Sequence, residues 1–177
     1  IKTEHLERYQ GQWSEQEINE VAQQVAKGAI KYGMNRIDPT KKIVFDMKEW
    51  LKLDGESGPY IQYVSARINS MVKKIEAESG LKEADWATLS TPQELEILRL
   101  LPQFNQITQQ ACEQYRPSVL TAYLYDVARA FNSFYSECPV SAAPTGLKEA
   151  RLKLAQACAS TLAQGLTILG IEAPSKM

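Results

Sequence analysis

The sequence has 177 residues, the length of one domain or of one domain with a short appendage. Hydrophobic residues make up 44% and charged residues 23%, as in an ordinary globular protein, and a chain of this length can bury a substantial core. Twenty Lys and Arg against 21 Asp and Glu leave a formal net charge of -1, which excludes a generically cationic nucleic-acid-binding protein but leaves room for a local basic patch.

The first predicted helix begins at the capping box Ser14-Glu15-Gln16-Glu17. In such a box the serine oxygen accepts from the third amide of the helix, and the glutamate reaches back to the cap. An apolar stripe with helical spacing then runs from Ile18 to Ile30 and ends near Gly33. Trp13 lies directly before the cap, where a hydrophobic residue often staples the first turn. These features predict one long amphipathic helix.

A short extended segment is predicted near residues 43–46. Its apolar run, Ile43-Val44-Phe45, follows the turn signal Asp38-Pro39. Asp46 then begins a short helical turn that reaches Leu51. Almost all of the remaining chain has a helical period, so this segment is the one convincing non-helical apolar run.

A helix of about 31 Å is predicted from Pro59 to about Ser79, with proline at its first position and Gly80 at its end. The next predicted helix begins at Pro92 with a capping box, breaks at Pro102 and continues as a polar stretch to Tyr115. Two more helices are predicted, from Pro117 to Cys138 and from Leu147 to Gly170. Short loops between them favour antiparallel neighbours. The sequence therefore predicts an all-α fold, an antiparallel helical bundle with one short extended segment.

The catalytic and metal-binding repertoire of the sequence is sparse. His5 is its one histidine, so there is no plausible Ser-His or Cys-His pair, and no glycine-rich phosphate-binding loop is present. Cys112, Cys138 and Cys158 lie far apart without zinc-ligand spacing, which favours a reducing compartment. We therefore predict no catalytic residue, no metal site and no cofactor in this chain. No apolar run approaches the length of a membrane span.

Several other side chains are assigned to structure rather than to function. The three cysteines are interpreted as small core hydrophobes, and Trp50 and Trp86 as packing residues rather than base-stacking ones. Acidic residues on the predicted helices are interpreted as solvated faces without a general acid-base pair; they include Glu94, Glu96, Asp126 and Glu149.

One helix face combines two phenols and a guanidinium. At about 100° per residue, Tyr60, Tyr63 and Arg67 lie within about 60° of one another. Aromatic faces beside a planar cation suit unstacked nucleotide bases and a phosphate. The same spacing also suits a tyrosine-rich packing face whose arginine pairs with a carboxylate of the bundle. Spacing alone leaves both interpretations open.

The string GPYIQYVSARINS at residues 58–70 resembles the signature helix of the C-terminal anticodon-binding (DALR-type) domain of arginyl-tRNA synthetases. Further strings similar to that family follow the same order along the chain: Gly28–Tyr32 with Ile43–Asp46, Tyr123–Ala128 with Phe131–Tyr135, and Ala150–Leu152 with Leu169–Met177. The resemblance extends from Ser14 to Met177 and ends on the C-terminal Met of that family.

The resemblance implies a class I synthetase that joins arginine to tRNA(Arg) with ATP and Mg. Its catalytic domain, with HIGH-like and KMSK-like motifs, would lie upstream, since neither motif is present here. Residues 1–177 would then be the excised anticodon-binding helical domain, inactive alone, with residues 1–13 as the tail of the junction to the catalytic domain. The expected partners are the anticodon loop of tRNA(Arg) and that upstream domain, without DNA or membrane, in a cytoplasmic monomer.

The resemblance also implies a set of anticodon-binding residues. Carried over by motif, they are Tyr60, Tyr63, Arg67, Tyr135 and Met177. By helical phase, Phe134 and Tyr125 compete with Tyr135 for the place in the pocket.

Lysines near this helix are candidate phosphate contacts. Lys73 and Lys74 follow the signature string, and Lys41 and Lys42 form a second pair. Cations at the C-terminal end of a helix are also favoured by the helix dipole alone, as a solvated end.

Two other functions remain compatible with the sequence. One is a stand-alone helical protein-interaction module derived from this domain, which the near-neutral charge favours. The other is the equivalent domain of another synthetase. Solvent-open phenols beside Arg67 would support RNA binding, whereas a broad exposed apolar patch would support a protein partner.

Overall fold

The structure, a computed structural model, describes residues 11–77 and 82–177, and these residues form helices without any β-strand. The helices are α1 (Glu15–Asn35), α2 (Met47–Trp50), α3 (Gly58–Glu76), α4 (Pro92–Leu100), α5 (Phe104–Glu113), α6 (Pro117–Glu137) and α7 (Leu147–Ile168), with the short 3-10 helices η3 (Trp86–Thr88) and η4 (Leu101–Gln103). The prediction of an all-α fold is confirmed.

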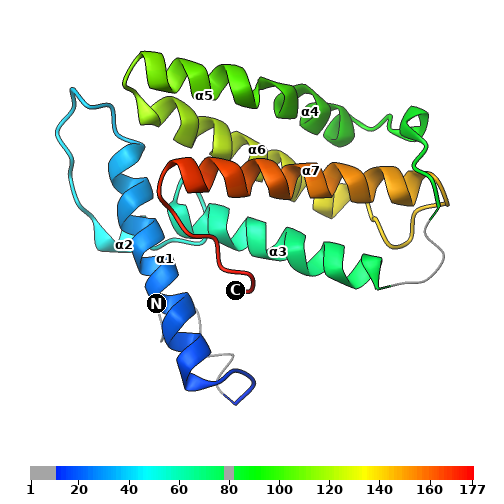
Figure 1. Cartoon of the computed structure of the whole chain (residues 1–177), viewed down its shortest axis with the longest axis horizontal. Coiled ribbons are helices and arrows are strands. Elements are labelled where there is room, and N and C mark those ends of the chain that lie inside the picture. The colour runs from blue at the N-terminus through cyan, green and yellow to red at the C-terminus, as the bar shows by residue number, and fades with distance from the viewer. Residues whose placement is uncertain (1–10, 78–81) are drawn as a thin grey trace.

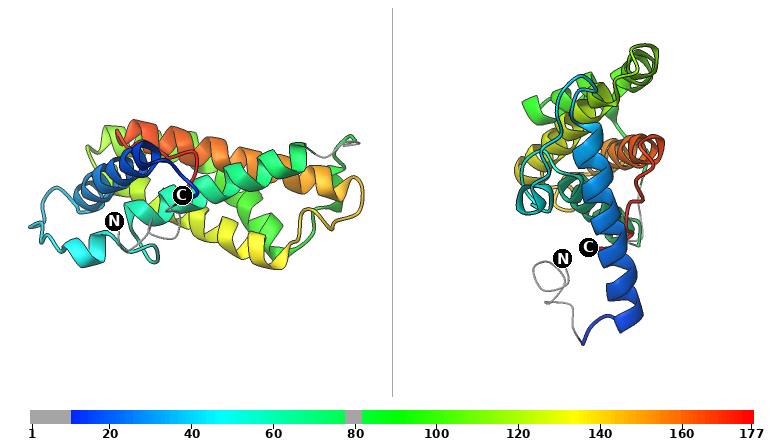
Figure 2. Two further views of the ribbon diagram at one scale, coloured as in Figure 1. Left: turned by 90° about the horizontal axis from the view of Figure 1, so that it is seen from below. Right: turned by 90° about the vertical axis from the view of Figure 1, so that its left-hand side faces the viewer.

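Figure 1 shows a lengthwise bundle crossed by one helix. Helices α3 and α6 run in one direction, and α4, α5 and α7 run in the other, so the predicted antiparallel bundle is confirmed. Helix α1 crosses one end of the bundle steeply, and its first half extends beyond it (Figure 2). The predicted extended segment at residues 43–46 lies in the connection between α1 and α2, and Val44 there is 71% exposed.

The local signals for helix ends are largely realised. Both capping boxes form, at Ser14 with Glu17 and at Thr91 with Glu94. Asp46 accepts from two amides at the start of α2, as predicted. Helix α3 is capped by Ser57, whose side chain accepts from the amide of Tyr60, and helix α3 ends before Ala77. The predicted stop at Gly80 lies outside the described residues, as does His5.

The core lies between α3, α6 and α7. Its largest fully buried side chains come mainly from these helices and include Ile61, Ile68, Leu124, Phe131, Phe134, Leu154 and Leu162. A second, smaller cluster on the first half of α1 joins Val21, Ala22 and Val25 to Trp13, Ile18 and Met177. Trp13 therefore packs at the start of α1, where the sequence predicted a staple.

Helices α1 and α3 cross with their backbones in close approach. A Cβ atom on Gly58 would lie 2.5 Å from the carbonyl oxygen of Gly28, so a side chain at position 58 would separate the helices, while one at position 28 would collide with the Gln62 side chain. Next to this crossing, Nε2 of the buried Gln62 donates to the carbonyls of Gln24, at 3.1 Å, and Glu172, at 2.7 Å. The C-terminal segment is thereby held against α1 and α3.

The interpretation of the acidic residues as solvated is wrong for two of the four. Glu94 is 0% exposed and forms an ion pair with Nε of Arg151 at 2.6 Å. Glu149 is also buried and accepts from the amides of Lys82 and Gly146, which lower its pKa. Both acids sit in first turns of helices that pack against other elements, and periodicity within one helix does not reveal such a partner. Glu96 lies at the surface, as predicted.

The Glu94–Arg151 pair joins three parts of the bundle. Besides the Arg151 guanidinium, Glu94 accepts from the amides of Ser90 and Thr91 at 2.8 Å each. Arg151 in turn donates to the carbonyl of Pro139 at 2.9 Å. Burial alone would raise the pKa of Glu94, but these hydrogen bonds and the guanidinium hold the pKa below its ordinary value.

Two assignments of other side chains are also corrected. Cys112 is exposed, whereas Cys138 and Cys158 are buried as predicted, and burial raises the pKa of the Cys158 thiol to about 12. Trp86 is 56% exposed, so it is not a packing residue, while Trp50 is buried. Both errors have the same cause: the packing of the helices leaves these two side chains exposed to solvent, which the local sequence does not reveal.

We expect Arg151→Met to lower the free energy of unfolding by about 3–5 kcal/mol, because it leaves the Glu94 carboxylate buried without a counter-charge. Urea denaturation at neutral pH measures this loss. The control is Arg99→Met, whose partner Glu96 is exposed on the same α4, and it should change stability by less than about 1 kcal/mol.

Equal losses in the two variants would contradict the importance of the buried pair.

In the wild type, the lowered pKa of Glu94 contributes stability above pH 4.5, its ordinary value, and that stability is lost as the pH falls through the lowered pKa. Arg151→Met should keep only part of this contribution, because the amides of Ser90 and Thr91 still donate to Glu94.

Candidate nucleic-acid interface

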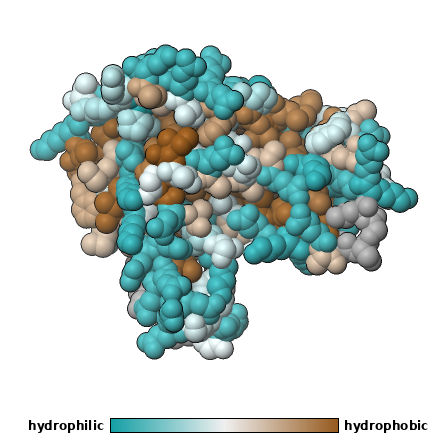
Figure 3. Space-filling model, in the orientation of Figure 1, coloured by the Kyte–Doolittle hydropathy of each residue, from teal (hydrophilic) through white to brown (hydrophobic). Residues whose placement is uncertain are grey.

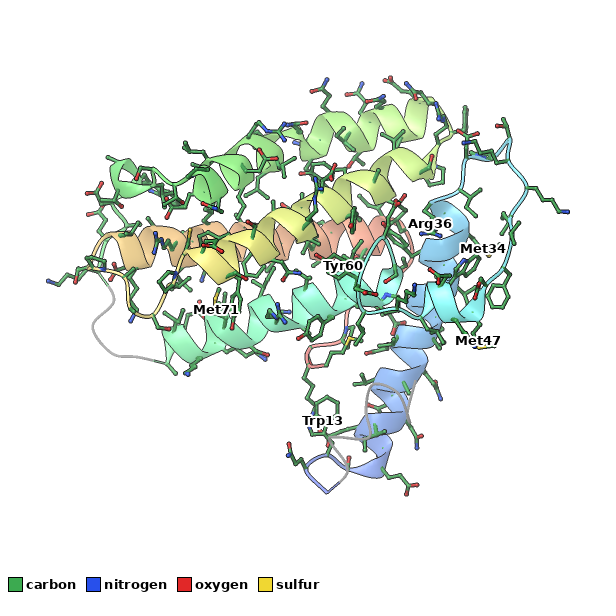
Figure 4. The ribbon with its side chains drawn as sticks, turned by 180° about the vertical axis from the view of Figure 1, so that it is seen from behind. Trp13, Met34, Arg36, Met47, Tyr60 and Met71 are labelled. Atoms are coloured by element: carbon green, nitrogen blue, oxygen red, sulfur yellow. The ribbon has the colours of Figure 1, made fainter. Side chains whose placement is uncertain are left out.

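Helix α3 divides into a buried and an open side. Ile61, Val64 and Ile68 are completely buried against the core, which turns Tyr60, Tyr63 and Arg67 toward the opposite side of α3, where all three are half-buried. Figure 4 shows Tyr60 near the start of this helix and Met71 further along it. The three residues singled out in the sequence therefore share one accessible surface.

Arg67 lies at the centre of this surface. Its Nη2 atom donates to the hydroxyl of Tyr63 at 2.5 Å, and its guanidinium carbon is 4.6 Å from the centroid of that ring. The same guanidinium lies 5.3 Å from the ring centroid of Tyr135 on α6. Arg67 has no carboxylate partner within residues 11–77 and 82–177, so the alternative of an arginine paired with a bundle carboxylate does not describe it.

Asn132 on α6 connects the two ends of the cluster. Its Oδ1 accepts from Nη1 of Arg67 at 3.0 Å, and its Nδ2 donates to the hydroxyl of Tyr60 at 2.8 Å. Sequence reasoning missed this residue as a site residue, although its position seven residues after Tyr125 and three before Tyr135 places it on their side of α6. Burial raises the pKa of Tyr60, whereas the hydrogen bond from Asn132 lowers it, with a net rise.

The three competing aromatic residues of α6 have different environments. Phe134 is completely buried in the core and does not reach this surface. Tyr135 is 43% exposed and faces Arg67. The ring of Tyr125 lies 5.7 Å from that of Tyr60. The open cluster therefore comprises Tyr60, Tyr63, Arg67, Tyr125, Asn132 and Tyr135, and we name it the α3/α6 cluster.

The other predicted site residues lie away from this cluster or at its end. Met177 packs against α1 in the smaller apolar cluster, beside Trp13. The place of Met177 in a pocket with Arg67 stays a prediction. Lys73 and Lys74 are exposed in the last turn of α3. The structure therefore brings together four of the five motif-derived residues.

The described residues offer little else for chemistry. No group of three or more His, Cys, Asp or Glu side chains among them is arranged to hold a metal ion. None of their helices is both long and apolar enough to cross a bilayer. The candidate site is therefore the α3/α6 cluster, with its accessible tyrosine rings and the guanidinium of Arg67.

The sequence model of the DALR anticodon binding domain family matches residues 61–177. The chain belongs to this family. It is 50% identical over 178 residues to an arginine–tRNA ligase of Bdellovibrio bacteriovorus, covering all of this chain and 30% of that protein. It is 41% identical over 167 residues to an arginine–tRNA ligase of Pyrococcus abyssi, covering 93% of this chain and 27% of that one.

Solved structures agree with this assignment. Arginyl-tRNA synthetase of Thermus thermophilus matches with a TM-score of 0.84 and 39% identity, over 90% of this chain and 28% of that protein. The synthetase of Plasmodium falciparum matches with a TM-score of 0.83 over 99% of this chain and 31% of that one, but at 23% identity, which supports the fold alone. This DALR domain thus spans less than a third of the length of these relatives.

We expect Asn132→Leu to raise the pKa of Tyr60 further, because the variant loses the hydrogen bond that favours the phenolate. The ring signals of Tyr60 in an NMR pH titration measure this shift. Asn105→Leu, an exposed position on α5, is the matched control and should leave Tyr60 unchanged. A Tyr60 pKa that stays constant or falls in Asn132→Leu would show that the amide does not bridge the cluster in solution.

Proposed function

We propose that this DALR domain binds the anticodon loop of tRNA(Arg) as the recognition part of an arginine–tRNA ligase. The observation that carries the proposal is the accessible Arg67 guanidinium between the rings of Tyr63 and Tyr135, with Asn132 linking it to Tyr60. Family membership supports the same assignment, since its relatives are arginine–tRNA ligases. The same relatives favour a domain of an arginine–tRNA ligase over the equivalent domain of another synthetase.

The cluster suits unpaired RNA for two physical reasons. Unstacked bases of a loop can stack on tyrosine rings, which contributes about 1–3 kcal/mol per base. A guanidinium has five N–H donors, and Arg67 uses Nη1 and Nη2 in its two hydrogen bonds within the described residues. Its remaining donors are available for a phosphate or for a base edge. Asn132 fixes the orientation of the guanidinium before RNA arrives, which reduces the ordering required on binding.

Lys73 and Lys74 fit a secondary role as phosphate contacts. They are exposed at the C-terminal end of α3, on the helix that also carries the aromatic residues. Such contacts orient RNA without reading its sequence. The aromatic cluster would then supply discrimination, and the lysines would supply a salt-dependent contribution.

The ligation chemistry belongs to the part of the enzyme that this chain does not contain. We assign ATP and Mg binding to that part, because the sequence has no phosphate-binding loop and spans less than a third of its relatives. Purified alone, the chain should not activate arginine. A cytoplasmic, monomeric enzyme remains our proposal for the whole protein.

A protein contact is supported by a separate surface. Ile30, Phe45 and Met47 are 49%, 57% and 61% exposed, and they line a hollow of about 540 Å³ between α1 and the α2 region. Hydrophobic residues are visible beside α1 in Figure 3. We propose that the remaining parts of the synthetase pack here, so that protein docking and RNA binding use different faces. The domain would then also bind protein, as the alternative of a helical protein-interaction module expects, but through a surface separate from the RNA-binding one.

We expect Tyr63→Ala to weaken binding of an anticodon stem-loop RNA of tRNA(Arg) by about 5- to 150-fold, the equivalent of one lost base stack. Fluorescence anisotropy with the 177-residue chain measures the affinity. Tyr63→Phe keeps the ring and should retain most of it. Tyr115→Ala, an 86% exposed tyrosine outside the cluster, is the matched control and should bind like the wild type.

Lys73→Ala should weaken binding less, about equally for cognate and anticodon-swapped RNA, and should reduce the salt slope by about 1. Circular dichroism and thermal melting confirm that each variant folds. If Tyr63→Ala folds normally and binds the cognate RNA with wild-type affinity, the assignment of this surface to the anticodon loop is wrong.

A further inference from the structure

The accessible side of α3 continues beyond Arg67. Ser70, Met71 and Lys74 follow Arg67 by three, four and seven residues, which places them on its side of the helix. From Tyr60 to Lys74 this side is about 21 Å long at 1.5 Å per residue. The α3/α6 cluster occupies only the first half of that length.

The second half borders a hollow of about 530 Å³. Its floor and walls are formed by Arg67, Ser70, Met71, Lys74, Ile75, Tyr135 and the segment Pro139, Val140, Ser141 and Ala142. The volume falls within the range of about 300–1,000 Å³ that small-molecule sites occupy. Because Arg67 and Tyr135 line it, the hollow is continuous with the α3/α6 cluster.

The charge of the hollow distinguishes it from two hollows of similar volume elsewhere in the described part of the chain. Its lining includes the cations of Arg67 and Lys74 and no carboxylate. The hollow beside α1, of about 540 Å³, and the one beside α5, of about 590 Å³, have no charged residue in their linings. Lys74 has no ion-pair partner in the described part of the chain. An anionic occupant with an apolar or aromatic body fits this combination.

The wall opposite α3 is held in place before any ligand binds. Arg151, fixed by its buried pair with Glu94, donates to the carbonyl of Pro139 at 2.9 Å. The amide of Cys138 donates to the carbonyl of Phe134 at 2.8 Å, and that of Ala143 to the carbonyl of Val140 at 3.2 Å. A preformed wall lowers the entropy lost on binding.

We propose that this hollow binds one further unpaired nucleotide of the RNA loop, next along the strand to those on the α3/α6 cluster. The base lies between Met71 and the 139–142 wall against the ring of Tyr135, and Lys74 contacts its phosphate. The proposal rests on the proposed function, because the same RNA must first occupy the cluster. Continuity with the cluster and the two unopposed cations favour a nucleotide over a protein segment.

The test combines a filled hollow with a scan of the RNA loop. Ser141→Trp places a large ring in the hollow from an exposed position, and Ser133→Trp makes the same change at an exposed α6 position outside the hollow. Anticodon stem-loop RNAs in which each unpaired nucleotide in turn is abasic are titrated against both variants and the wild-type chain. We expect one loop position whose abasic form weakens wild-type binding at least about fivefold, the lower limit for one stacked base. That loss should disappear in Ser141→Trp and persist in Ser133→Trp.

Charge reversal at the two lysines gives a second measurement of RNA affinity that does not depend on the abasic scan. Lys74→Glu should weaken binding more than Lys73→Glu, although both change the net charge equally, because Lys73 does not line the hollow. Equal effects of the two lysine variants, together with an abasic profile unchanged in Ser141→Trp, would overturn the nucleotide site. If binding is nevertheless sensitive to Tyr63→Ala, only this site is rejected. A wild-type chain that does not bind the RNA would instead reject the proposed function itself.

Discussion

The complete burial of one side of α3 is the constraint on which the candidate interface depends. Ile61, Val64 and Ile68 are each 0% exposed, so rotating the helix about its axis would withdraw three large side chains from the core. Each such side chain contributes about 1.5–3 kcal/mol when fully buried, which makes the rotation unfavourable by several kcal/mol. The opposite side, with Tyr63 and Arg67, is therefore open because the core holds α3 in this orientation. This candidate interface follows from packing and needs no special backbone conformation.

Features that depend on neighbours in the sequence could be predicted. The capping box at Thr91, the proline starts of α4 and α6, and the shared side of α3 follow from hydrogen-bonding and helical geometry within about four residues. The antiparallel bundle followed from short connections between long amphipathic segments. For the site, the grouping of Tyr60, Tyr63 and Arg67 needed only the helical period, whereas the choice of Tyr135 came from the family resemblance.

Features that depend on a partner distant in the sequence could not be predicted. Asn132 lies 65 residues from Arg67, and Arg151 lies 57 residues from Glu94, so no periodicity connects either pair. The burial of Glu94 against α7 is a consequence of how the helices pack, and the same acidic residue in an isolated helix would be solvated. Cys112 shows the reverse case, an apolar side chain that the packing leaves exposed. The family resemblance did not supply Asn132 as a site residue either, although Asn132 lies within the string Phe131–Tyr135 that carries the resemblance.

The formal net charge of -1 is a poor guide to the field that an RNA strand would meet. The buried Glu94 and Arg151 cancel one another and add nothing to this sum, whereas the buried carboxylate of Glu149 counts as one negative charge although two backbone amides compensate it. Such a buried carboxylate enters the sum but is screened from an approaching phosphate, whereas Lys74 at the end of α3 is not opposed by a nearby carboxylate in its hollow. Association with an anion depends on the local excess of exposed cations, and counterion release counts only the phosphates that are neutralised. A nearly neutral domain can therefore bind RNA with a shallow salt dependence, provided that stacking on tyrosine supplies most of the affinity.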